Sequence, residues 1–132
     1  MSLEAFAALK YLSLETFRKS GAGVRTPIWF AGDPARNLGS GDARFFVYTE
    51  ADSGKVKRIR NNGRVRIAPC DVRGKILSDW VDARAEIVTG SDFEYGMQLL
   101  NKKYFPWKQL LDFFAKFRSR ERVVIAILPA QA

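Results

Sequence analysis

The sequence contains no histidine and only one cysteine, Cys70, among its 132 residues. Histidine is the commonest general base and zinc ligand, so its absence excludes His-dependent catalytic triads and the usual zinc sites. No metal site is expected. A single thiol cannot form an intrachain disulfide, and the cytoplasm is therefore the expected location.

Long apolar runs are also missing. No stretch approaches the roughly 20 apolar residues that span a membrane. The first residues, MSLEAFAALKY, lack both the basic leader and the apolar run of a signal peptide. No membrane partner is expected. The length predicts a single domain over residues 1–132, and a chain this short gains from forming a homodimer because it buries only about two-thirds of its unfolded surface.

Acidic residues are scarce, with 14 Asp and Glu against 22 Lys and Arg, a net charge of +8. Such a balance fits an anionic partner: nucleic acid, a membrane surface or a phosphorylated small molecule. Four of the cations, Lys55, Lys57, Arg58 and Arg60, fall within six positions, and no acidic residue follows them until Asp71.

Most of the chain reads as short β-strands with alternating or fully apolar patterns, separated by glycine-rich turns. The predicted strands cover residues 11–17, 24–31, 44–49, 64–72, 80–88 and 123–128. Pro27 cannot donate to a ladder, so its strand is expected at an edge or with a bulge. Helices are predicted over 53–61, from 91–92 to about 103, and over 107–118. The pattern predicts a mostly β protein, a six-stranded antiparallel closed or split barrel with peripheral helices.

The basic cluster has two interpretations. It can be the solvated face of a helix that Val56 and Ile59 anchor to the sheet. It can also be a phosphate site, since the first turn of a helix offers unpaired N–H groups and a positive dipole end. In the second interpretation, the groups that would hold the phosphate are Thr49, Ser53, Gly54 and Lys55.

Nucleic acid fits the sequence less well. A duplex would need basic residues over a wider face, and single strands would need exposed aromatic side chains for stacking. The aromatic residues here fall mostly in predicted strands and on the apolar side of the 107–118 helix, where core packing explains them. A barrel that binds single-stranded nucleic acid is kept as a remote alternative.

The segment Y-T-x-x-x-S-x-K, made by Tyr48, Thr49, Ser53 and Lys55, resembles the phosphate-binding segment of the pyridoxamine 5′-phosphate oxidase-like FMN-binding split-barrel family. The resemblance implies that the serine and lysine hold the ribityl phosphate. It also implies that an upstream strand lies along the isoalloxazine ring. That strand corresponds to Arg25, Thr26, Pro27 and Ile28.

Residues 11–90 are more closely similar to the branch of probable deazaflavin (coenzyme F-420)-dependent enzymes, through VRTPIWF, SGKVKRIRNN, VRIAPCDVRG and WVDARA. Two features depart from the family. The loop 32–42 is longer than expected, and its role is open. The chain also lacks the Arg-x-His tail that true oxidases use on pyridoxal phosphate, so vitamin B6 oxidation is not expected.

The resemblance implies a homodimeric oxidoreductase that transfers a hydride between bound FMN or F-420 and a small-molecule substrate. Arg25 would stabilise negative charge on the reduced ring, and Lys57 and Arg58 would contact the phosphate or the acidic tail of a deazaflavin. No catalytic residue is assigned. The alternative is a non-catalytic carrier or sensor of the same cofactor. Cys70 is expected to be a buried apolar residue, and Trp80 to lie in the core or at a dimer interface.

Overall fold

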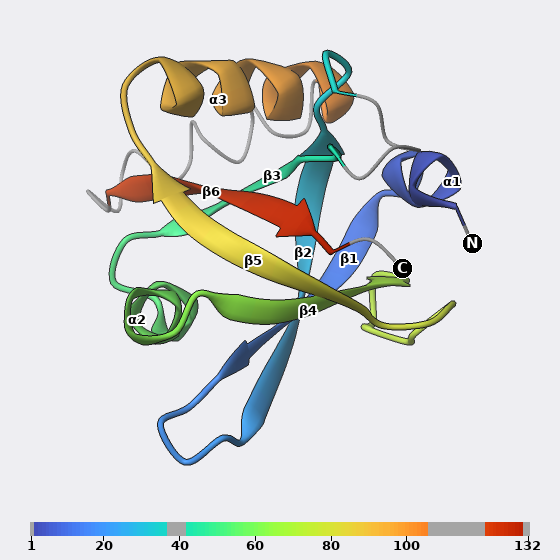
Figure 1. Ribbon diagram of the computed structural model, residues 1–132. Helices are drawn as coiled ribbons and strands as arrows, with labels where there is room; N and C mark the ends of the chain where they lie inside the picture. The colour runs from blue at the N-terminus through green and yellow to red at the C-terminus, as the bar shows by residue number, and fades with distance from the viewer. Residues whose placement is uncertain (1, 37–41, 106–120, 131–132) are drawn as a thin grey trace.

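The computed structural model describes residues 2–36, 42–105 and 121–130 of the chain. Three helices and six strands follow one another along these residues (Figure 1). In chain order they are α1 (Leu3–Ala7), β1 (Tyr11–Phe17), β2 (Gly23–Gly32), β3 (Phe45–Glu50), α2 (Gly54–Asn61), β4 (Arg64–Cys70), β5 (Val81–Val88), α3 (Ser91–Lys103) and β6 (Arg122–Pro129).

The six strands form one closed barrel in the order β1-β2-β3-β6-β5-β4, and β4 pairs back onto β1. Every pairing is antiparallel. The predicted antiparallel six-stranded barrel is therefore confirmed. β6, apolar along most of its length, lies between β3 and β5 as a buried central strand.

The barrel opens between β2 and β3. These strands pair only over Phe30 to Gly32 on β2 and Phe45 to Val47 on β3. Before Phe30, β2 pairs with β1 alone among the described residues, and the β1–β2 hairpin extends beyond the barrel in Figure 1. Pro27 lies in this half of β2, so the prediction of an edge position is confirmed.

Two apolar clusters hold the fold together. One fills the barrel with side chains such as Leu12, Phe45 and Ile127, together with Val56 and Ile59 of α2. These last two anchor α2 to the sheet as predicted. The other lies outside the barrel, where α3 covers β2, β3 and β6 (Figure 1).

Close packing of α3 depends on Gly96. A Cβ atom at this position would come within 2.9 Å of both Phe46 and Val124. A side chain here would push the helix away from the sheet, because buried carbon atoms do not approach so closely.

Some element boundaries differ from the sequence prediction. The strand predicted over 64–72 ends at Cys70, because the Asp71 carboxylate accepts hydrogen bonds from the amides of Arg73 and Lys75 and forms a turn. The strand predicted from residue 80 begins at Val81.

Helix α1 was not predicted. It has only five residues, with Ser2 as its N-cap and Phe6 buried in the barrel cluster. The helix predicted over 107–118 lies outside the described residues. Among those that are described, no helix has the length and apolarity needed to cross a bilayer.

Candidate functional site

A groove of about 410 Å³ opens where β2 and β3 separate, and we refer to it as the split groove. One wall is the half of β2 that pairs with β1 but not with β3, and the opposite wall is the end of β3. The start of α2 and the first residue of β6 complete it. Its lining residues are Tyr11, Pro27, Ile28, Trp29, Tyr48, Thr49, Glu50, Ser53, Lys55 and Arg122.

Most of the groove-lining residues that come from β3, α2 and β6 are polar or charged. Ser53 is the N-cap of α2, and its Oγ accepts a hydrogen bond from the amide of Val56 at 3.4 Å. Other amides of the first helical turn have no partner within the helix. Thr49 adds a hydroxyl, and Lys55 and Arg122 add positive charge.

The Lys55 ammonium is half-buried, and no described residue accepts a hydrogen bond from it or forms an ion pair with it. Burial lowers the pKa of Lys55, the positive charge of Arg58 lowers it further, and Glu50 partly opposes both effects. An anion bound beside Lys55 would therefore relieve an existing electrostatic cost.

Aromatic side chains also line the split groove. Trp29, Tyr11 and Tyr48 line it, and Trp29 lies opposite Tyr11 in the β1–β2 ladder. The indole of Trp29 stacks on the ring of Tyr104 with 4.5 Å between centroids and 6° between planes. The Arg122 guanidinium lies over Tyr48, 5.1 Å from the ring centroid, so a cationic and an aromatic side chain of the groove lining contact each other.

Arg25 and Thr26, two of the predicted ring contacts, do not line the groove, whereas Pro27 and Ile28 do. The Arg25 guanidinium bonds to Glu15 at 2.8 Å and lies over the Trp80 ring. Glu15 also accepts a hydrogen bond from Arg66 at 2.6 Å, and the Arg66 guanidinium lies over the Trp80 ring as well.

These charges form a row across four neighbouring strands. Arg25 on β2 faces Glu15 on β1, Glu15 faces Arg66 on β4, and Arg66 faces Asp82 on β5. Glu15 is only 4% exposed. The hydrogen bond from Arg66 and then that from Arg25 outweigh burial and lower the pKa of Glu15, so the carboxylate stays ionised.

The remaining residues of the predicted basic cluster divide into different environments. Arg58 donates to Thr16 Oγ1 at 2.6 Å, and Lys57 is exposed. Gly54 starts α2, and a Cβ there would meet the Arg58 guanidinium at 2.7 Å. Of the basic cluster, only Lys55 lines the groove. Ser53, Tyr48 and Thr49 of the same segment line it too.

Sequence reasoning did not select Tyr11, Trp29, Glu50 or Arg122, which also line the groove. They lie on four strands that meet only through the strand order of the barrel. The signal that could have found Arg122 is its position at the start of the last strand, directly opposite Glu50 of β3.

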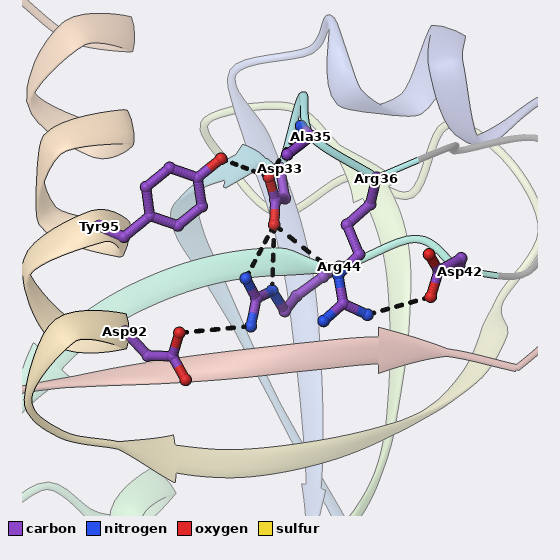
Figure 2. A network of polar contacts seen from close by, with 7 residues as sticks. All are labelled: Asp33, Ala35, Arg36, Asp42, Arg44, Asp92 and Tyr95. Carbon is purple, nitrogen blue, oxygen red and sulfur yellow. Dashed lines mark hydrogen bonds and ion pairs between the residues drawn. The ribbon is translucent and has the colours of Figure 1, made fainter.

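Figure 2 shows the polar network that joins the two ends of the loop 32–42 to α3. Asp33, 1% exposed, accepts hydrogen bonds from the Tyr95 hydroxyl at 2.5 Å and from Arg44 at 2.9 and 3.2 Å. Burial would raise the pKa of Asp33, but Tyr95 and Arg44 outweigh it and the pKa is lowered. The outer ion pair, Arg36 with Asp42, measures 3.1 Å and is exposed.

Cys70 is a buried residue, as expected. Burial raises the pKa of its thiol, and the negative charge of Asp71 raises it further. The thiol therefore stays protonated and has little nucleophilic character. Trp80 is half-buried, and the guanidinium groups of Arg25 and Arg66 both lie over its ring.

No protein-family model and no curated protein sequence matches the chain. Several solved structures are similar to it. A pyridoxamine 5′-phosphate oxidase-like protein from Listeria innocua is 16% identical, with a TM-score of 0.63 over 98% of this chain and 90% of the other. The heme storage protein HutZ from Vibrio cholerae is 17% identical, with a TM-score of 0.66 over 100% and 93%. An F-420 reductase is 18% identical, with a TM-score of 0.60 over 99% and 95%.

At these identities the likeness establishes the fold and leaves the activity open. The chain has the split-barrel fold of the pyridoxamine 5′-phosphate oxidase-like proteins.

Proposed function

We propose that the chain binds a flavin-type cofactor, FMN or the deazaflavin F-420, in the split groove and acts as an oxidoreductase on a small-molecule substrate. The observation that carries the proposal is that one groove brings together aromatic side chains and the hydroxyl and cationic groups at the start of α2. A ligand with a planar ring at one end and a phosphate at the other matches both.

The residues present fit the phosphate part of such a cofactor. Ser53, Thr49 and the first turn of α2 supply hydroxyl and amide donors, and Lys55 and Arg122 supply the positive charge. Pro27 and Ile28 lie on the half of β2 that does not pair with β3, and they form the adjoining wall. A volume of about 410 Å³ lies within the roughly 300–1,000 Å³ typical of small-molecule sites.

When bound, a flavin or deazaflavin supplies the hydride chemistry. The protein's own residues then bind, orient and exclude water. Trp29 and Tyr48 cover the apolar part of the groove, and Lys55 neutralises the phosphate. Arg25 pairs with Glu15 of β1 and so helps to hold β2, the strand that forms one wall, against β1.

Heme storage, the role named for the Vibrio cholerae neighbour, is less well supported. The sequence has no histidine to serve as the commonest proximal ligand of heme iron. A carrier or sensor of the same flavin-type cofactor stays the alternative, because binding residues are the same in both roles.

Two measurements test the proposal. First, absorbance titration of the purified protein with FMN and with F-420 should give saturable binding of one of them. Second, stopped-flow mixing of the loaded, reduced protein with candidate acceptors should show cofactor reoxidation faster than that of free cofactor. Failure of both cofactors to bind would refute the proposal. Tight binding without turnover would favour the carrier role.

A further inference from the structure

We propose that Trp29 forms the flat wall on which the ring of the bound cofactor packs, and that Tyr104 is a positioning residue that fixes the indole in this orientation. This inference rests on the proposed function and assigns a ring contact outside the sequence motif. Neither residue belongs to the phosphate-binding segment.

Tyr104 is held at its hydroxyl by the backbone of two strands. Its Oη accepts a hydrogen bond from the Phe30 amide at 3.0 Å. The carbonyl oxygens of Lys10 and Phe30 lie 2.6 and 2.8 Å from the same oxygen and share its single proton. Tyr104 is 7% exposed, and burial raises the pKa of its hydroxyl, so the proton remains available for these bonds.

The position of this anchor matters. Phe30 is the residue at which β2 begins to pair with β3, and Lys10 directly precedes β1. The Tyr104 hydroxyl therefore fixes the C-terminal end of α3 to the point where the barrel opens. A ring anchored there has little freedom to rotate or to move away from the sheet.

The Trp29 indole lies parallel to this fixed ring, 4.5 Å between centroids and 6° between planes. Trp29 is half-buried and lines the groove. Contact with Tyr104 restricts the side-chain rotamer before any ligand binds, and a preorganised aromatic surface loses less entropy on binding than a mobile one. Offset stacking of a planar ligand ring on an indole adds affinity beyond simple burial.

The test compares ligands that carry different parts of the cofactor. FMN and F-420 carry ring and phosphate, riboflavin carries the ring alone, and ribose 5-phosphate carries the phosphate without a fused ring. Trp29→Leu should weaken the binding of FMN or F-420, and of riboflavin, on the order of tenfold, the loss expected for a stacking contact. The affinity for ribose 5-phosphate should not change.

A spectroscopic signature separates stacking from general damage. Indole stacking quenches flavin fluorescence, so FMN bound to the wild-type protein should be strongly quenched and FMN bound to Trp29→Leu should regain emission. Trp29→Phe keeps a flat ring and should recover part of the lost affinity. Tyr104→Phe, which keeps the ring and removes the hydroxyl, should bind FMN more weakly while ribose 5-phosphate binding is preserved.

Trp80→Leu is the matched control, because Trp80 is also half-buried and stacked but does not line the groove. It should leave quenching and affinity as in the wild type. Two results would overturn the role of Trp29 and leave the proposed function standing. One is unchanged FMN binding and quenching in Trp29→Leu. The other is a loss of ribose 5-phosphate affinity in Trp29→Leu as large as the loss of FMN affinity. If the wild-type protein binds neither FMN nor F-420, the proposed function itself is wrong.

Discussion

At the scale of single residues, Lys55 is the strongest candidate for a phosphate ligand among the predicted residues, because its ammonium is half-buried and has no anionic contact within hydrogen-bonding distance in the described structure. Lys55→Ala should weaken cofactor binding by about 1.5–3 kcal/mol, the range for a hydrogen bond to a charged group. Isothermal titration with FMN and F-420 measures this loss, and an unchanged dissociation constant would contradict the phosphate assignment.

Lys57 offers a way to tell the two cofactors apart. It is exposed and lies two residues beyond Lys55, outside the groove lining. If the acidic tail of F-420 reaches it, Lys57→Ala should reduce F-420 affinity by about 0.5–1 kcal/mol at low salt and leave FMN affinity unchanged. Lys19→Ala, an exposed lysine of the β1–β2 hairpin, is the control for general charge loss. Equal losses of F-420 affinity in Lys57→Ala and Lys19→Ala would show that Lys57 has no specific contact with the F-420 tail.

Lys103 predicts a pH dependence of stability. Its ammonium donates to the carbonyls of Ala7 and Leu9 at 3.2 and 2.6 Å, and burial lowers its pKa to about 8. Between about pH 8 and pH 10.5 the unfolded chain holds a proton that the folded chain has released. The free energy of unfolding should therefore rise with pH in this window, by about 1–3 kcal/mol from this residue, and show no such slope below pH 8.

Urea denaturation at several pH values measures this slope, and other groups that titrate in the window contribute to it in every variant. The informative quantity is the difference between wild type and Lys103→Met, since only the first carries the Lys103 contribution. Lys102→Met, which replaces an exposed neighbour, should retain the wild-type slope. Identical slopes in wild type and Lys103→Met would show that burial does not perturb this lysine.

At the scale of elements, the loop 32–42 is anchored at its base to α3. Asp33→Ala should lower the free energy of unfolding by about 3–5 kcal/mol, because it leaves the largely buried Arg44 guanidinium without its main partner. Asp42→Ala, which removes the 66% exposed carboxylate of the same loop, should change stability by less than about 0.5 kcal/mol. Chemical denaturation of both variants tests this contrast. Similar losses of unfolding free energy would show that the buried Asp33 contributes no more to stability than the exposed Asp42.

Because Asp33 links the loop 32–42 to α3, this residue cannot be removed with the rest of the loop without loss of stability. A deletion of residues 33–41 would remove Asp33 itself, so it would destabilise the fold even if the rest of the loop were a simple insertion.

The strands could be predicted because each carries a local signal. β1 was predicted with the observed bounds, since residues 11–17 combine alternation with a glycine-rich turn that follows. The helix predicted over 53–61 also has a local signal at its start, where Asp52 and Ser53 are both residues that can cap, and Ser53 is the N-cap of α2. α1 was missed because five residues are too few to show a helical period, and its stability comes from the burial of Phe6 in the barrel.

The candidate site was predictable only where its residues are close in sequence. Tyr48, Thr49, Ser53 and Lys55 fall in one segment and do line the groove together. Trp29 and Arg122 are far apart in sequence, and strand order alone brings them together. The outward position of Arg25 also had no local signal, because it depends on Glu15 of the neighbouring strand.

At the scale of the whole molecule, a homodimer remains a prediction. A chain of 14.9 kDa has a large surface for its volume, and Val72 and Leu77, 63% and 49% exposed, lie in the segment between β4 and β5. Sedimentation equilibrium should give about twice the chain mass. A mass of 14.9 kDa at all concentrations would show a monomer, and the groove would then be complete within one chain.

The half of β2 that pairs with β1 alone among the described residues also affects how the protein is expected to behave at high concentration. A bare strand edge is a template on which a second extended chain can add, and this is a common route to aggregation. Pro27 lies in the middle of this edge and has no amide proton to contribute to such a ladder. A residue that lines the groove is therefore also expected to hinder the hairpins of neighbouring molecules from joining into one continuous sheet.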